Sequence, residues 1–472
     1  MMQAKRFSWL SLLLIFALIL VACGGGEEAA PAEEAAPAEE AAPAEEAEAP
    51  AEEEMEEAPA EGLVGGDAIL EAALNGDYPG TTVPFFGALV DEDARRFENS
   101  VAAFEEQSGI DIEYEGSGDF ETLIQVRFDG GDSPDIGGHP QPGLLKGLVD
   151  QNAVVDPSEF LGMDFLEEHY AQGWIDDSTL GGQIAGVWYR GNVKSLVWYP
   201  KDDFDAAGYE IPTTWEELLA LSDQIVADGG VPWCIGIESS GATGWTATDW
   251  IEDIMLRTQP PEKYDEWTSG ELLFDSPEVR NAIETLAVIW KNPDYVLGGD
   301  IGIATTPFGD APNGMFDDPP SCWLHRQASF IPAFFPEGTV IGEDVDFFYF
   351  PMIDPEYGEP VLTAGDIAAM YNDRPEVRAV MAYLATGESM KGWVEAGGFI
   401  APHTDSNLDW YTTDIDRRFA EMLQNASVTR FDGSDLMPAA VGAGAFWTNI
   451  TDWVTGTSID QALPPIDAAW PR

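Results

Sequence analysis

The stretch "VPFFGALVDEDARRFENSVAAFEEQSGIDIEYE", residues 83–115, carries three consecutive secondary-structure signals. It begins with a short apolar run, which predicts a buried strand. The following segment places Phe97, Val101 and Phe104 on one face of a helix that we expect to end at Gly109. The last six residues alternate apolar with acidic side chains, as a strand with one buried face does. The order strand, helix, strand predicts an α/β fold.

Similar signals continue along the chain. The segment "TTWEELLALSDQIVADGG" opens with a capping box between Thr214 and Glu217, and another helix is expected to start at Ser276. The apolar run "DFFYFPMI" predicts a buried strand, and the helical period returns in "RPEVRAVMAYLATGE". A chain of 472 residues exceeds one compact core, so we expect two lobes.

The first residues predict export. In residues 1–22 two basic residues precede an apolar run that is short for a bilayer span and ends in small residues, as in a signal peptide. The sequence "LVAC" at its end resembles the lipobox of bacterial lipoproteins, which implies that Cys23 is acylated and anchors the protein to the outer face of the cell membrane. An ordinary signal peptide with a chance cysteine is the alternative.

The segment after the cysteine predicts a disordered tether. Its repeats consist almost only of Glu, Ala and Pro, and each proline removes a backbone donor and restricts the residue before it. We therefore expect residues 23–78 to be an extended, self-repelling linker between the anchor and the folded lobes.

Charge and cysteine usage narrow the possible partners. The formal net charge of -65 makes nucleic acid, anionic lipid and phosphate-bearing ligands poor partners and favours a neutral ligand. Apart from Cys23, the chain has only Cys234 and Cys322, and in an exported protein we expect these two to form a disulfide. Two buried free thiols are the alternative.

Catalytic signatures are absent from the sequence. There is no nucleophile elbow, P-loop, complete dinucleotide fingerprint or zinc-protease motif, and the four histidines lack metal-ligand spacing. We therefore expect no enzyme activity, no metal and no cofactor. A glycoside hydrolase remains the enzymatic alternative, because its pair of carboxylates leaves no spacing signal in a sequence this acidic.

Aromatic residues in glycine-rich, polar segments predict a sugar site. Trp188 and Tyr189 lie in "GVWYRGN", Trp245 lies in "ESSGATGWTATDW", and Trp447 lies in "GAGAFWTNITDW". Flat rings stack on the apolar faces of a pyranose, while neighbouring polar groups bind its hydroxyls. The alternative for each of these residues is a place in the core.

The chain resembles the extracellular solute-binding proteins of ATP-driven carbohydrate importers, in the group of alpha-glucoside-binding lipoproteins. The resemblance is carried by "FETLIQVRFDGGDSPDIGGHPQPGLL", "SLVWYPKDDFDAAGYEIPTTWEELLALSDQI", "CIGIESSGATGWTATDWIEDIML", "CWLHRQASFI" and "GWVEAGGFIAPH". It implies two α/β lobes that close on a ligand about a hinge. Lobe 1 would comprise residues 79–193 and 347–402, and lobe 2 residues 194–346 and 403–472.

The resemblance also implies positions that contact the ligand. In lobe 1 they are Leu89, Asp91, Ser117, Asp119, His139, Gln141 and Asp366. In lobe 2 they are Trp245, Arg326, Gln327 and Trp447. The backbone around Gly397, Gly398 and Phe399, near the end of the second lobe 1 segment, would also approach the sugar. Asp91 could instead be a helix N-cap, Ser117 and Asp119 turn residues, and His139 a surface histidine.

These implications define one expected function. A monomeric, membrane-tethered protein would capture a neutral carbohydrate, such as an alpha-glucoside or an oligosaccharide, and deliver it to the permease subunits of the importer. The disulfide would brace the segments that carry Trp245 and Gln327. The alternatives are the same fold binding a polyol, a polyamine or a sugar phosphate, and a tethered glycoside hydrolase.

Overall fold

The computed structural model describes residues 64–397, 399–411 and 413–471. The predicted signal peptide, Cys23 and most of the predicted tether lie outside the described residues. The described residues all belong to one compact unit. In its described part, no helix is long and apolar enough to cross a membrane.

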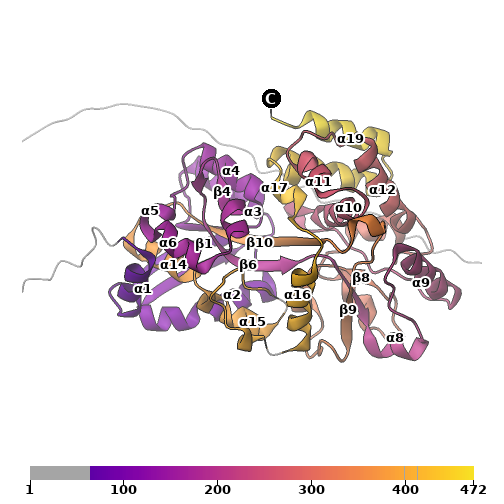
Figure 1. Ribbon diagram of the computed structural model, residues 1–472, viewed down its shortest axis with the longest axis horizontal. Coiled ribbons are helices and arrows are strands. Elements are labelled where there is room, and N and C mark those ends of the chain that lie inside the picture. Colours follow the sequence, from indigo (N-terminus) through magenta and orange to yellow (C-terminus); the bar gives the residue numbers. More distant parts are fainter. Residues whose placement is uncertain (1–63, 398, 412, 472) are drawn as a thin grey trace, which may run out of the picture. The chain divides into compact units, whose positions relative to one another are not determined.

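Lobe 1 is built on a six-stranded mixed sheet (Figure 1). Strand β1 pairs in parallel with β2 on one side and β3 on the other. Strand β10 runs antiparallel to both β3 and β6 and pairs in parallel with β11. The bounds are β1 Thr81–Gly87, β2 Ile110–Gly116, β3 Ile136–His139, β6 Val187–Val193, β10 Val361–Met370 and β11 Thr429–Phe431.

Helices surround this sheet, and the predicted strand–helix–strand unit is confirmed. The helices of lobe 1 are α1 Gly66–Leu74, α2 Asp91–Ser108, α3 Phe120–Gly130, α4 Pro142–Asp150, α5 Ser158–Leu161, α6 Met163–His169, α7 Gln172–Ser178, α14 Pro375–Leu384 and α15 Lys391–Ala396, with a β4 Thr179–Leu180, β5 Gln183–Ile184 hairpin. Helix α2 buries Phe97, Val101 and Phe104 and ends at Gly109, which adopts the left-handed conformation with φ 75°.

The beginning of the folded unit differs from the prediction. The disordered tether was expected to continue to residue 78, but Gly66–Leu74 forms helix α1, which packs on α14. Its Ile69 and Ala73 are fully buried in the core of lobe 1. The segment has one apolar face at helical spacing, and burial of that face offsets the entropy of ordering it.

Lobe 2 contains a three-stranded antiparallel sheet in the order β8-β7-β9. Its strands are β7 Leu196–Pro200, β8 His325–Arg326 and β9 Val345–Tyr349. Its helices are α8 Lys201–Ala207, α9 Trp215–Ala227, α10 Trp245–Thr258, α11 Pro261–Thr268, α12 Pro277–Trp290, α13 Gly299–Thr305, α16 Asp414–Asn425, α17 Gly433–Leu436, α18 Trp447–Val454 and α19 Ile459–Ala468. The predicted capping box of Thr214 and Glu217 starts α9, and Ser276 caps α12.

The chain passes from the lobe 1 sheet to the lobe 2 sheet where β6 leads into β7, through Lys194 and Ser195. The second boundary, expected at residue 347, is wrong because β9 pairs with β7 and therefore belongs to lobe 2. That crossing lies between β9 and β10. His403, expected to begin lobe 2, pairs with Tyr170 of lobe 1, so the third crossing follows it.

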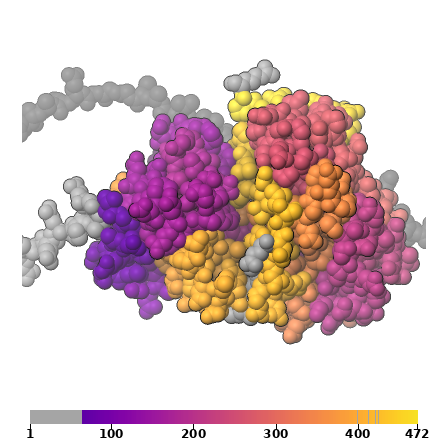
Figure 2. Space-filling model, viewed as in Figure 1, coloured from indigo at the N-terminus to yellow at the C-terminus, as the bar shows by residue number. Residues whose placement is uncertain are grey.

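Figure 2 shows the segment that follows His403 as a gold surface between the purple surface of lobe 1 and the pink surface of lobe 2.

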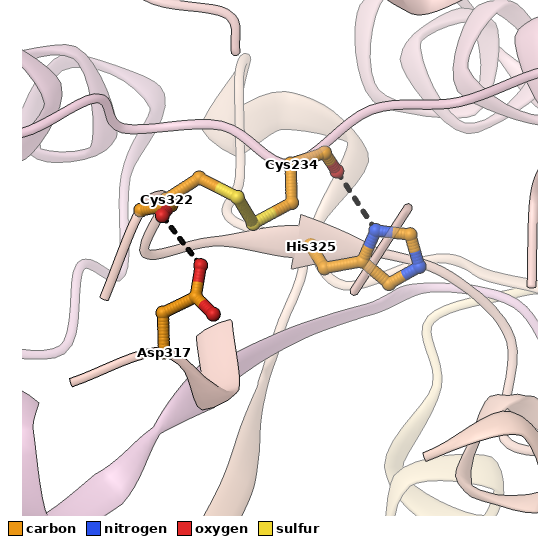
Figure 3. Close-up of a disulfide and its surroundings, with 5 residues drawn as sticks. Cys234, Asp317, Cys322 and His325 are labelled. Atoms are coloured by element: carbon orange, nitrogen blue, oxygen red, sulfur yellow. Dashed lines mark hydrogen bonds between the residues drawn. A yellow bond between two sulfur atoms is a disulfide. The ribbon is translucent and has the colours of Figure 1, made fainter. Parts of the chain in front are cut away.

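The predicted disulfide between Cys234 and Cys322 is present in lobe 2 (Figure 3). Both cysteines are buried in an apolar cluster. The backbone amide of Cys234 donates to the carbonyl of Leu324 at 2.8 Å, and its carbonyl lies 2.8 Å from Nδ1 of His325. The disulfide therefore fixes the segment that leads to α10 beside β8.

Replacing both cysteines by alanine should lower the free energy of unfolding by about 2–5 kcal/mol, because the disulfide closes a loop with a sequence separation of 88. Chemical denaturation followed by tryptophan fluorescence measures this change. Cys23→Ser is the matched control and should leave the free energy unchanged. Equal stability of the double variant and the control would contradict this role for the disulfide.

Candidate ligand-binding cavity

A cavity of about 150 Å³ lies at the junction of the two lobes, and side chains of both lobes line it. From lobe 1 these are Ala88, Leu89, Val90, Asp93, Ser117, Gly118, Glu121, Pro140, Gln141, Arg190, Asn192, Ala364, Gly365 and Asp366. From the segments of lobe 2 they are Ser239, Ala242, Trp245, Phe308, Phe330, Phe334, Asp435 and Trp447. Lys194, at the first crossing, also faces it.

The loop after β1 is held in place by Tyr114 of β2. The hydroxyl of Tyr114 donates to the carbonyl of Leu89 at 3.1 Å and accepts from its amide at 2.9 Å. A Cβ atom on Gly116 would lie 1.9 Å from the same carbonyl, so only glycine fits at that position. These constraints place Leu89 in the cavity wall at the carboxyl end of a parallel strand, where α/β folds commonly bind ligands.

Arg190 forms the charged centre of the lobe 1 wall. Its Nη1 donates to Asp93 Oδ2 at 2.9 Å, and its Nε donates to Asp366 Oδ2 at 2.5 Å. Burial lowers the pKa of the guanidinium, but the charges of Asp366 and Asp93 outweigh burial and raise it. Burial raises the pKa of Asp93 despite the arginine. The guanidinium lies 5.2 Å from the ring centre of Phe399, within the range of a cation–π interaction.

Lys194 forms the second charged centre. Its ammonium donates to Asp249 Oδ1 at 2.9 Å and to Asp432. Asp249, Glu252 and Asp432 each place a carboxylate oxygen within 4.8 Å of the others. Burial raises the pKa of Asp249 to about 7, whereas Lys194 outweighs burial at Asp432 and lowers its pKa. The lysine thus supplies the positive charge for this carboxylate cluster.

Two further carboxyl groups face the cavity. Glu121 accepts a hydrogen bond from Gln141 Nε2 at 3.1 Å, and burial raises its pKa to about 6. Burial also raises the pKa of Asp435, and the neighbouring charge of Asp432 adds to the shift. Among the described residues, neither group forms an ion pair within 4 Å, in contrast to Asp93 and Asp366.

Aromatic rings form the lobe 2 side of the cavity. The ring centre of Trp245 lies 5.2 Å from that of Phe308 and 6.0 Å from that of Phe330. Trp245 opens α10 and is only partly buried. Trp447 is almost fully buried, and its indole Nε1 donates to Ser434 Oγ at 3.2 Å.

The structure brings part of the predicted site together. The predicted residues that line the cavity are Leu89, Ser117, Gln141, Trp245, Asp366 and Trp447. Gly398 lies outside the described residues. The other predicted positions occupy the core, the surface or the lobe contact.

Asp91 lies outside the cavity lining, and the acidic residue of α2 that lines the cavity is Asp93. Asp91 is the exposed first residue of α2, whereas Asp93 is buried and lines the cavity. Asp119 is exposed and lies outside the lining, where its Oδ1 accepts from the amide of Gly241 at 2.9 Å. His139 is buried behind the wall, its Nε2 contacts the hydroxyl of Tyr371, and burial lowers its pKa to about 3. It is therefore a neutral core histidine.

The residues Trp188 and Tyr189 of β6 are also core residues. The indole of Trp188 donates to the carbonyl of Trp174 at 2.7 Å, and Tyr189 packs with its ring centre 5.7 Å from that of Phe85. The sequence "VWYRGN" contributes Arg190 and Asn192 to the cavity instead. Both are buried polar residues of β6, in which all seven residues are buried.

The remaining predicted positions lie outside the cavity lining. Arg326 is buried in lobe 2 and donates to Asp253 Oδ2 at 2.6 Å, and the amide oxygen of Gln327 accepts from the backbone of Ala328. The carbonyl of Gly397 accepts from Arg96 at 3.3 Å. Phe399 is buried against Trp393 with ring centres 4.5 Å apart. None of these four predicted residues lines the cavity in the described part of the chain.

A two-lobe α/β fold with a polar and aromatic cavity at the lobe junction is typical of solute-binding proteins. The chain belongs to the bacterial extracellular solute-binding protein family, whose sequence model matches residues 87–392.

Relatives cover most of the chain. It is 44% identical over 399 residues to the osmoprotective compounds-binding protein GgtB of Synechocystis sp., which covers 84% of this chain and 94% of that protein. It is 43% identical over 413 residues to the alpha-glucosides-binding periplasmic protein AglE of Rhizobium meliloti, covering 85% and 90% of the two chains.

Solved structures share the fold. A chitin oligosaccharide binding protein superimposes with a TM-score of 0.69 at 17% identity, over 82% of this chain and 97% of that chain. Maltose-bound MalE3 of T. maritima gives a TM-score of 0.65 at 16% identity, over 82% and 98%. At these identities the likeness establishes the two-lobe fold.

Replacing Arg190 by methionine should lower the free energy of unfolding by about 3–5 kcal/mol, because Asp93 and Asp366 would remain buried without a cation. The loss should shrink at low pH, because burial raises the pKa of Asp93 and protonation of this carboxyl group removes one of the two buried charges. Urea denaturation at two pH values measures both effects. Arg417→Met is the matched control, since its pair with Asp414 is exposed and should contribute about 0–1 kcal/mol. Equal losses in the two variants would contradict the role of Arg190.

Proposed function

We propose that this protein is the substrate-binding component of a carbohydrate importer and captures a neutral alpha-glucoside or oligosaccharide between its lobes. The observation that carries the proposal is the cavity itself, which combines acceptor oxygens from lobe 1 with aromatic rings from lobe 2. The names of GgtB and AglE, which refer to osmoprotective compounds and alpha-glucosides, support a small polar solute of this class.

The unpaired polar atoms favour a ligand rich in hydrogen-bond donors. Asp93 Oδ1, Gln141 Oε1 and Asn192 Oδ1 are buried without a partner among the described residues, and all three side chains line the cavity. A buried acceptor without a donor costs about 1–3 kcal/mol, so hydroxyl groups that donate to these oxygens would recover that energy. Sugar hydroxyls fit this requirement.

The charges favour a neutral ligand over an anionic one. The two cations that line the cavity, Arg190 and Lys194, each already pair with two carboxylates. A phosphate or carboxylate ligand would have to compete with these carboxylates and approach Glu121 and Asp435. A neutral carbohydrate meets no such penalty.

A polyamine is a second candidate ligand. Glu121 and Asp435 face the cavity without an ion pair in the described part of the chain, and a protonated amine would supply the missing charge. The aromatic rings beside them would also attract a cation.

The cellular role follows from the predicted anchor. We propose that Cys23 is acylated, that the protein acts as a monomer on the outer face of the cell membrane, and that it delivers its ligand to permease subunits. The acidic Glu-Ala-Pro segment would keep the lobes near the permease and raise their effective concentration there. We expect binding without turnover, since members of the family are solute-binding proteins.

A thermal-shift screen of the purified chain tests the ligand class. Maltose, larger alpha-glucans, a polyol and spermidine would be compared at equal concentrations, because a tight ligand raises the melting temperature by mass action. We expect an alpha-glucoside to give the largest shift and to be recovered unchanged. Stabilisation by spermidine alone would establish the second candidate, and release of glucose would establish a hydrolase.

Replacing Trp245 by alanine should weaken binding of the glucoside by about 1–3 kcal/mol, because a ring in the cavity wall would no longer stack on the sugar. Titration calorimetry measures the dissociation constant. Trp470→Ala is the matched control, since Trp470 is a partly buried tryptophan of lobe 2 outside the cavity lining. Unchanged affinity in a folded Trp245→Ala variant would assign this ring to packing alone.

A further inference from the structure

A loop of lobe 2 contacts the tip of lobe 1 at the edge of the cavity. Residues 238–244 lead into α10, and Ser117, Gly118 and Asp119 precede α3. Ser117 and Ser239 line the cavity itself, whereas Asp119 and Gly241 lie outside its lining. The contact between Asp119 and Gly241 therefore joins the lobes without contributing to the cavity wall.

The lobe 2 loop satisfies its backbone amides internally, with one exception. The amides that find acceptors within lobe 2 belong to Glu238, Ser239, Ser240, Ala242, Thr243 and Gly244. The amide of Gly241 donates instead to Asp119 Oδ1 of lobe 1 at 2.9 Å. The loop thus presents one donor to the opposite lobe.

The backbone of the loop is shaped for this contact. Ser240 adopts the left-handed conformation with φ 48°, which is unfavourable for a residue with a side chain. A Cβ atom on Gly241 would lie 3.0 Å from Asp119 Oδ1, so the glycine permits the close approach of the carboxylate. Turn conformation and residue size both favour the hydrogen bond across the lobes.

The side chain of Asp119 does not cap its own helix. Asp119 occupies the N-cap position of α3, where an aspartate commonly accepts from an amide of the first helical turn. Its side chain makes no such cap, while its own amide donates to Ser117 Oγ at 3.1 Å. The carboxylate is therefore available to lobe 2.

We propose that Asp119 is a positioning residue that stabilises the closed arrangement of the lobes through the amide of Gly241 and thereby slows release of the ligand. The inference rests on the proposed function as a two-lobe binding protein. Asp119 acts on affinity without touching the ligand, because any contact made only in the closed state shifts the equilibrium toward that state. Opening the lobes would leave both groups to water.

The first test measures release. Removing one hydrogen bond to an exposed carboxylate should raise the dissociation rate of maltose about threefold to tenfold in Asp119→Ala. Asp119→Asn, which keeps an acceptor oxygen, should restore most of the lifetime. Asp129→Ala is the matched control, since Asp129 is an exposed aspartate of α3 whose side chain accepts only from Gln125 of the same helix among the contacts described. Wild-type release from Asp119→Ala would overturn the proposal.

A second test needs no ligand. A Cβ atom on Gly118 would lie 3.7 Å from Cβ of Ser240, which matches the separation in a disulfide. In a Cys23→Ser background, Gly118→Cys and Ser240→Cys would supply the only free thiols, and their disulfide would report closure in a glutathione buffer. We expect Asp119→Ala to lower the effective concentration of these thiols about threefold to tenfold, with no change in Asp129→Ala.

The two tests separate the proposals. If maltose does not bind but the cross-link weakens in Asp119→Ala, the ligand assignment fails and the role of Asp119 stands. If the cross-link forms equally well with and without the carboxylate of Asp119, the inference fails whatever the ligand is.

Discussion

The buried Lys194 joins the first chain crossing to the second and to the segment that follows β11. Its backbone amide donates to the carbonyl of Leu362 at 2.8 Å, which joins the first crossing to the start of β10. Its ammonium pairs with Asp249 of α10 and with Asp432, which precedes α17 after the third crossing. A charge this deeply buried is stable only with such partners. The relative placement of the crossing segments, and hence of the two cavity walls, depends on this residue.

The neighbouring groups extend the same arrangement into both lobes. Ser195 Oγ donates to Asp253 at 2.7 Å and accepts from the amide of Leu362 at 2.9 Å. Glu252 accepts from the amides of Gly433 and Ser434, both at 2.9 Å, and so fixes the start of α17. Asp435 in that short helix faces the cavity. The crossing and the cavity therefore share one hydrogen-bonded network.

The sequence predicted elements whose signals are local. The helix face of Phe97, Val101 and Phe104 and the capping box at Thr214 depend on neighbours within a few residues, and both are present. The partners of Arg190 lie 97 and 176 residues away, so no local pattern identified it. For the same reason β9 was assigned to the wrong lobe, since an apolar strand gives no sign of which sheet it joins.

The sequence also does not show whether a tryptophan lies in a cavity wall or in the core. Trp245 and Trp188 both lie near glycine residues, but Trp245 lines the cavity and Trp188 is buried in the core.

The ion pairs of Arg190 and Lys194 with carboxylates of the protein affect which ligands the cavity selects. Arg190 and Lys194 are held by carboxylates before any ligand enters, so their charges orient the surrounding oxygens and remain compensated. The acceptors left over, such as Asp93 Oδ1 and Gln141 Oε1, have fixed positions in the lobe 1 wall. A solute can satisfy them only by presenting donors in the matching arrangement, and a solute that lacks one donor leaves a buried oxygen unpaired. Discrimination among neutral solutes would therefore depend on the geometry of hydroxyl groups, while the aromatic rings of lobe 2 supply contact area that is less demanding of orientation.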